Sequence, residues 1–199
     1  DKMISFKQNN EITYDDKDLM EENSFIGAEI EKTPIPIFSE IKDKLPQPIW
    51  ESHEDYLDCY WKVWEIAFKN LYQPKEGTGF ITNYIDAAFN GCIFMWDSAF
   101  MLMFGKYADR IFKFQKTFDN FYSHQHVDGF ICRQIEEDTG NDVFARHDPA
   151  STGPEVMTWC EWEYYLNFGD KERLARVFPC LVAYHQWMQE HFTWRDGTY

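Results

Sequence analysis

Apolar stripes with helical spacing constrain this chain more than any other feature of its sequence. From His53 onward, large apolar side chains recur every three or four positions, while charged side chains occupy another face. The first stripe consists of Leu57, Trp61, Trp64, Phe68 and Leu71. Further stripes lie within residues 111–121, 159–166 and 174–188. Strand-like alternation is scarce, so the sequence predicts an all-α fold.

Glycine, proline and aspartate predict where two of these helices begin and end. Pro154 suits the first turn of the helix that carries the third stripe, and Gly169 is expected to end it. Asp170 can then cap the last helix, in which Pro179 is expected to introduce a kink.

The composition excludes several classes of function. The chain has 199 residues, of which 44% are hydrophobic, and a formal net charge of -15. This excess of acidic residues argues against sequence-independent binding to nucleic acid or to an anionic membrane, because both kinds of binding require a basic face. No apolar run reaches the roughly 20 residues of a membrane span. Asp97 interrupts the longest such run.

The chain divides into two parts by sequence pattern. Residues 1–50 are charged and poorly periodic, with prolines in "TPIPIF" and "LPQPIW" that favour extended backbone. We expect an N-terminal arm or lead-in there, followed by a helical domain over residues 51–199. A long mixed connection, "VDGFICRQIEEDTGNDVFARHDPASTGPE", separates two of the predicted helices, and such connections are usually functional.

Cysteine and histidine spacing does not predict a metal or redox motif. Five widely spaced cysteines form no close pair, and we interpret them as free, mostly buried thiols. His124 and His126 in "SHQHVDG" could ligate a metal, but no further ligand follows at a matching spacing. The alternative, a polar loop after a helix, is favoured.

A single carboxylate in the most apolar segment is the main candidate functional residue. In "GCIFMWDSAFMLMFG", Asp97 follows Trp96 and has Phe94, Met95 and Phe100 nearby. A buried carboxylate is unfavourable unless it is paired, hydrogen-bonded or protonated. We therefore expect apolar neighbours to favour the protonated form, as a general acid requires. The alternative is that Asp97 only caps its own helix.

Four segments in order resemble a known family: "MWDSAF", "DGFICRQI", "GPEVMTWCEWEYYLNFGDKERL" and "WRDGTY". Over residues 46–199 the chain resembles the glycoside hydrolases of family 63, which include processing α-glucosidase I and mannosylglycerate hydrolase, and more distantly the trehalases. The resemblance implies part of an (α/α)6 toroid of the six-hairpin glycosidase type, with residues 51–199 as its first half. It also implies an inverting hydrolase of α-glycosidic bonds.

The resemblance implies specific roles for individual residues. It places the general acid at Asp97, with Trp96 and Phe94 beside the sugar. Inversion also needs a second carboxylate to activate water. No residue here matches the family's base, so we expect that base, and the rest of the toroid, from a longer polypeptide. The scheme requires no metal and no cofactor.

Three further residues are candidates for sugar contacts, each with an alternative. Arg133 in "DGFICRQI" matches a segment that lines the family's sugar pocket, although Gln134 stands where an acidic residue is commoner. Its alternative is an ion pair with Glu136 or Glu137. Trp159 and Trp162 match the rim of the family's active site, where indole rings suit sugar faces. Their alternative is a place in the core.

The remaining carboxylates on the segment with Trp159 and Trp162 are expected to be mostly solvated; these are Glu155, Glu161 and Glu163. The expected partner is a carbohydrate substrate. The resemblance favours a periplasmic or extracellular location, and free thiols leave the cytoplasm open. A different function, a non-catalytic helical module that binds carbohydrate or protein, stays open as well.

Overall fold

The structure, a computed structural model, describes residues 5–6, 12–13, 22–146, 148 and 150–198. The α-helices are α2 (Phe38–Ile41), α3 (Glu54–Lys69), α4 (Met95–Gly105), α5 (Thr117–Ser123), α6 (Val156–Phe168) and α7 (Lys171–Phe192). Short 3₁₀ turns are η1 (Lys42–Lys44), η2 (Lys106–Ala108) and η3 (Phe114–Lys116). The strands are β1 (Ser5–Phe6), β2 (Ile12–Thr13), β3 (Leu71–Tyr72), β4 (Tyr84–Ile85), β5 (Cys92–Phe94) and β6 (Gln134–Glu136).

Three of the helix boundaries expected from local signals are confirmed, but Pro154 precedes the Glu155 N-cap of α6 and does not lie in the first turn of that helix. α3 begins directly after His53 and buries Trp64 and Phe68 of the first stripe. α6 ends at Gly169, which has a left-handed φ of 66°. The Asp170 carboxylate accepts a hydrogen bond from the Arg173 N–H at 2.9 Å and so caps α7. Each of these features depends on a few neighbouring residues, which explains why sequence alone predicts them.

The prediction of an all-α fold, and with it of part of an (α/α)6 toroid, is wrong. The described chain is mixed, with antiparallel strand pairs β1–β2, β3–β4 and β5–β6 beside its helices. In β5–β6, Cys92 pairs with Glu136 and Phe94 with Gln134. Strands of two or three residues are too short to show a two-residue alternation. The partners in β5–β6 also lie 40 or more residues apart in the chain, so no local signal reveals that pair.

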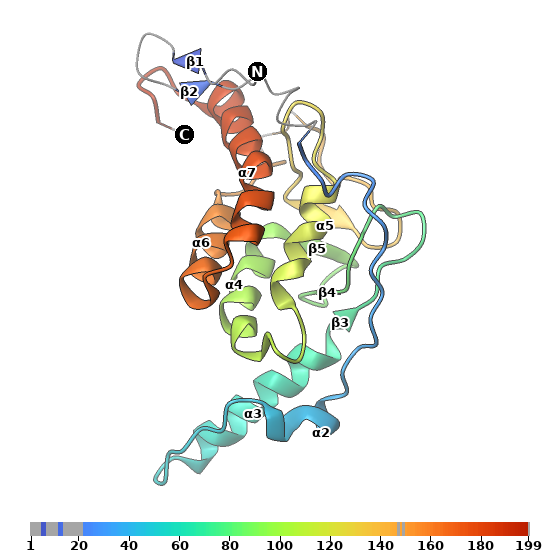
Figure 1. Ribbon diagram of the computed structural model, residues 1–199, viewed down its shortest axis with the longest axis vertical. Helices are drawn as coiled ribbons and strands as arrows, with labels where there is room; N and C mark the ends of the chain where they lie inside the picture. Colours follow the sequence, from blue (N-terminus) through green and yellow to red (C-terminus); the bar gives the residue numbers. More distant parts are fainter. Residues whose placement is uncertain (1–4, 7–11, 14–21, 147, 149, 199) are drawn as a thin grey trace.

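The core lies where α4 packs against α5 and α6, and α6 against α7 (Figure 1). It is strongly aromatic. Its fully buried rings come from α5, α7 and the segments between helices: Phe25, Phe80, Tyr84, Phe114, Phe118, Phe121, Tyr122, Phe130, Tyr184 and Trp187. At roughly 1.5–3 kcal/mol for each large apolar side chain buried, these rings supply a major part of the driving force for folding.

A buried ion-pair cluster joins α5, α6 and α7. Arg173 on α7 bonds Glu161 on α6 and Asp119 on α5, at 2.7 and 3.0 Å. Tyr122 donates to the same Glu161 carboxylate at 3.0 Å. The expectation that Glu161 is solvated is therefore wrong, because this side chain is 1% exposed. Apolar stripes in the sequence do not predict an ion pair between residues on different helices.

The predicted N-terminal arm, residues 1–50, lies partly outside the described residues. From residue 22 onward, this segment contacts the helical core. Phe25, Ile41 and Leu45 are buried. The Asn23 amide donates to the Tyr122 carbonyl oxygen at 3.0 Å. Figure 1 shows the segment running along the β3 and β4 side of the molecule before it reaches α2 and α3.

Across the described residues, none of the helices has both the length and the apolar character that crossing a bilayer requires.

Candidate functional site

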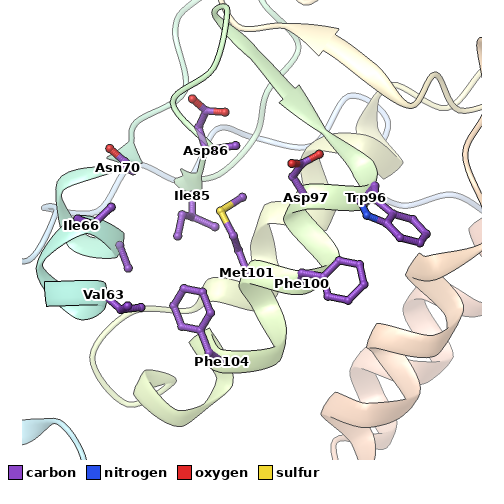
Figure 2. Close-up of a pocket in the computed structure, with 12 residues that line it drawn as sticks. Val63, Ile66, Asn70, Ile85, Asp86, Trp96, Asp97, Phe100, Met101 and Phe104 are labelled. Carbon is purple, nitrogen blue, oxygen red and sulfur yellow. The ribbon is translucent and has the colours of Figure 1, made fainter. Parts of the chain in front are cut away.

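A pocket of about 440 Å³ lies between α3, α4 and the segment that follows β4 (Figure 2). Its walls are mostly apolar, and its polar groups are Asn70, Asp86 and Asp97. The other lining residues are Val63, Ile66, Ala67, Ile85, Ala87, Trp96, Phe100, Met101 and Phe104. Figure 2 shows the carboxyl groups of Asp86 and Asp97 at one end of the pocket, with Val63 and Phe104 at the other.

Asp97 lies in the first turn of α4 and does not cap that helix. The N-cap is Phe94, which provides no side-chain cap, and Asp97 comes three positions later. The side chain of Asp97 is exposed at the pocket, so the predicted burial among apolar neighbours is not observed. The capping alternative is therefore wrong, and Asp97 is a carboxyl group that an incoming ligand can reach.

An exposed row of aromatic rings extends from the pocket to α6. Trp96 and Phe100 have ring centroids 5.1 Å apart, and Phe100 lies 5.9 Å from Trp159. Trp96 is 49% exposed and Trp159 is 42% exposed. Trp162, one turn further along α6, is also exposed and lies 5.3 Å from Tyr165. The alternative that the α6 tryptophans belong to the core is therefore wrong.

Phe94 and Arg133 do not line this pocket. Phe94 is half-buried at the end of β5, where its ring lies 6.0 Å from that of Phe89. Arg133 lies over the Phe144 ring, with 4.4 Å between the guanidinium carbon and the ring centroid, and its Nε donates to the Ala150 carbonyl oxygen. Its backbone carbonyl accepts the Met95 N–H at 2.8 Å. Arg133 thus fastens the segment after Phe144 beside the start of α4.

Two carboxyl groups that sequence reasoning missed lie behind Asp97. Asp86 follows β4 and is 3% exposed, and Glu137 follows β6 and is 8% exposed. The side chains of Asp86 and Glu137 lie close enough to influence each other's protonation. Asp86 stands alone between apolar residues in "YIDAAF", and Glu137 belongs to an acidic run, "EED". Only the β5–β6 pairing brings them together, so no sequence signal could have found the pair.

Burial and like charge make this pair unusual. Burial, followed by the charge of Asp86, raises the pKa of Glu137 to about 7. Burial also raises the pKa of Asp86, and the nearby Asp97 carboxylate adds to this rise. The carboxyl end of the pocket can therefore hold a proton near neutrality.

The two candidate histidine ligands are engaged in hydrogen bonds with protein groups. The His124 ring nitrogens lie 2.7 Å from the Asn120 carbonyl oxygen and 2.8 Å from that of Thr78. His126 lies 2.6 Å from an Asp142 carboxylate oxygen and 2.7 Å from the Arg146 guanidinium. Within the described residues, no three side chains of histidine, cysteine, aspartate or glutamate gather as a metal-binding set.

Comparisons with known proteins add one relative. No protein-family model and no solved structure matches the chain. An uncharacterized protein of Borreliella burgdorferi is 26% identical over 103 residues, which cover 51% of this chain and 21% of that protein. The matched part is thus about a fifth of the length of that relative.

Proposed function

We propose that this chain carries the acid half of a glycoside hydrolase site, in which Asp97 protonates the oxygen of an α-glycosidic bond. The observation that carries the proposal is the place of Asp97. It is a reachable carboxyl group at a mostly apolar pocket that the exposed residues Trp96 and Phe100 also line. Carboxyl groups beside aromatic platforms suit a sugar, because its C–H faces pack on rings and its hydroxyl groups donate to carboxylates.

The charge of the pocket supports a neutral substrate. Among the described residues that line it, none is lysine, arginine or histidine, and two are aspartates. An anionic ligand such as a phosphate ester would meet these carboxylates without a counter-charge. A sugar covering Asp97 would exclude water from this carboxyl group, and this exclusion favours the protonated form that a general acid needs.

The resemblance described above supports an inverting reaction, with the catalytic base supplied by a carboxylate outside this chain. Asp86 does not suit the role of base, because it is buried and its carboxylate accepts the Ala88 N–H. The missing base would have to lie about 6.5–9.5 Å from the Asp97 carboxyl group, which leaves space for the attacking water.

A second candidate function is carbohydrate binding without hydrolysis. The exposed row of Trp96, Phe100 and Trp159 favours it, because such a row can hold several sugar units in succession. This function would need no contribution from the Asp97 proton.

The deciding experiment is hydrolysis of a panel of aryl α-glycosides and α-linked disaccharides by the longest natural form of the protein. We expect Asp97→Asn to lower kcat/KM by at least about a hundredfold, within the range for a general acid. The matched control is Asp55→Asn, which removes an exposed first-turn carboxylate from α3. If Asp97→Asn retains parental activity, Asp97 is not the acid. If the parent protein binds these sugars without hydrolysing them, carbohydrate binding replaces hydrolysis as the proposed function.

A further inference from the structure

The pocket rests on a short segment with an unusual backbone, residues 86–91. Ala88 and Asn90 have φ values of 55° and 57°, and Gly91 has a φ of 65°. Non-glycine residues rarely adopt this left-handed region, and they persist there only when surrounding contacts hold them. The segment leads directly into β5 and then into α4, which carries Asp97. Whatever fastens this segment therefore also positions Asp97.

The Asp86 side chain holds one end of this segment, and the Glu137 backbone holds the other. Asp86 Oδ2 accepts the Ala88 N–H at 2.7 Å. The Glu137 N–H donates to the Gly91 carbonyl oxygen at 3.0 Å. The two carboxyl groups interact with each other across the segment.

A hydrogen bond between the Asp86 and Glu137 carboxyl groups requires a proton. Within the described part of the chain, no donor reaches Asp86 Oδ1 or Glu137 Oε1, and both atoms are buried. An ionised carboxylate can only accept hydrogen bonds, so two ionised groups would repel each other and leave both oxygens without a donor. One proton between them gives each oxygen a partner and removes the repulsion.

The surrounding groups supply little compensating positive charge. The titratable and charged groups that face the pair are Tyr72 on β3, Lys75, Tyr84 on β4, Asp97 on α4 and Asp138. Burial raises the pKa of both tyrosines, so they stay neutral. Lys75 is the one cation among these groups, and it is already hydrogen-bonded to the exposed Asp138.

We propose that Asp86 and Glu137 share one proton, and that this proton fastens segment 86–91 and with it the Asp97 end of the pocket. Asp86 and Glu137 are then positioning residues that act on the site through the backbone. Loss of the proton to solvent leaves two adjacent buried charges, which favours opening of the segment. The pocket is thus held at mildly acidic pH and loosens as the pH rises toward neutrality.

The direction of the pH effect follows from the linkage between proton binding and opening of the segment. A free glutamate binds its proton below about 4.5, whereas the pKa of Glu137 in the closed segment is about 7. Between these values the closed state binds more protons than the open one, so raising the pH favours opening. The opening equilibrium constant should rise about tenfold per pH unit over this range and level off above it.

The test is amide hydrogen exchange of residues 86–91 between pH 5 and 8, corrected for intrinsic exchange rates. In the parent, we expect opening to increase with pH as described. In Glu137→Gln, the amide NH₂ can donate to Asp86 without titrating, so the pH dependence should vanish and the segment should stay closed. Glu76→Gln, which neutralises an exposed carboxylate nearby in the chain, should behave like the parent.

Two further measurements keep the proposal open to refutation. Asp86→Asn replaces the other partner and should also abolish the pH dependence. In the parent itself, carboxyl ¹³C NMR should show Glu137 titrating near neutrality. An ordinary acidic titration of Glu137, or an unchanged pH dependence in Glu137→Gln, would overturn the proposal. None of these readouts needs a glycoside, so failure of the proposed function would not affect them.

Discussion

Arg173 on α7 grips the Glu161 carboxylate on α6 through two parallel hydrogen bonds, from Nε at 2.8 Å and from Nη2 at 2.7 Å. The same guanidinium donates to Asp119 on α5 at 3.0 Å and to the Gln115 carbonyl oxygen at 3.1 Å. The Arg173 side chain is only 12% exposed, so water compensates little for any lost partner. One side chain thus ties three helices together.

Replacing this arginine should destabilise the protein strongly. In Arg173→Met the helices keep a side chain of similar length, but the Glu161 and Asp119 carboxylates lose their counter-charge while still buried. Breaking a buried pair in this way costs about 3–5 kcal/mol. The measurement is the free energy of unfolding in urea, with Arg110→Met as a control at an exposed arginine. Equal losses in the two variants would show that the network contributes nothing beyond surface charge.

Gly140 should be intolerant of any side chain. Its φ is 72°, and an added Cβ would lie 1.7 Å from the Thr78 carbonyl oxygen. Gly169→Ala is the matched control, because Gly169 has a φ of 66° but no atom near the added Cβ. Left-handed strain alone costs about 1–2 kcal/mol. We expect Gly140→Ala to lose at least about 1 kcal/mol more, because overpacking adds to the strain. The measurement is thermal unfolding of both variants. Equal losses of stability in Gly140→Ala and Gly169→Ala would contradict the prediction.

Cys59 should be the thiol that reacts first. All five cysteines are free, and Cys59 is exposed while the other four are buried. Burial raises the pKa of Cys160 and of Cys180 to about 12, so their reactive thiolate forms are scarce at pH 8. Brief maleimide treatment followed by peptide mass spectrometry should show the label on Cys59, with all five labelled after denaturation. Early labelling of Cys160 would show that the α4–α6 contact opens readily.

Trp96 should contribute to sugar affinity if the proposed function holds. Trp96→Ala removes the ring beside Asp97, and losing one such stacking surface should weaken binding about tenfold. Trp50→Ala is the control, because Trp50 is 51% exposed and stacks on Tyr56 away from the pocket lining. Calorimetric titration with the oligosaccharide panel gives both affinities. An equal effect at Trp50 would argue for non-specific contact with aromatic rings.

Sequence reasoning succeeded where a few neighbouring residues decide the structure. The α3 stripe, the end of α6 at Gly169 and the Asp170 cap all depend on spacing within one or two turns. The sequence also singles out Asp97 locally, as the one charge in an apolar run, and its catalytic role is a proposal. Its exposure could not be predicted in the same way, because that depends on which face of α4 the rest of the fold covers.

The remaining features depend on pairing between distant segments. Neither β3–β4 nor β5–β6 has strands long enough to show alternation. Asp86 meets Glu137 only after β5 has paired with β6. The cluster of Arg173, Glu161 and Asp119 likewise requires three helices to meet. In both clusters, the role of a charged residue depends on a spatial neighbour from a distant part of the chain. The sequence does not identify that neighbour.

The β5–β6 ladder has a mechanical consequence for the pocket. α4 begins directly after β5, so Asp97 lies three residues beyond Phe94, the last residue of a paired strand. Side chains carried on paired strands and helices are held more precisely than those on loops. The other edge of β6 is paired as well, because Ile135 forms a bridge with Asp142 and the Val143 N–H donates to the Gln134 carbonyl oxygen at 3.1 Å. A deletion between Gly129 and Arg133 would pull β6 out of register and displace the pocket with it.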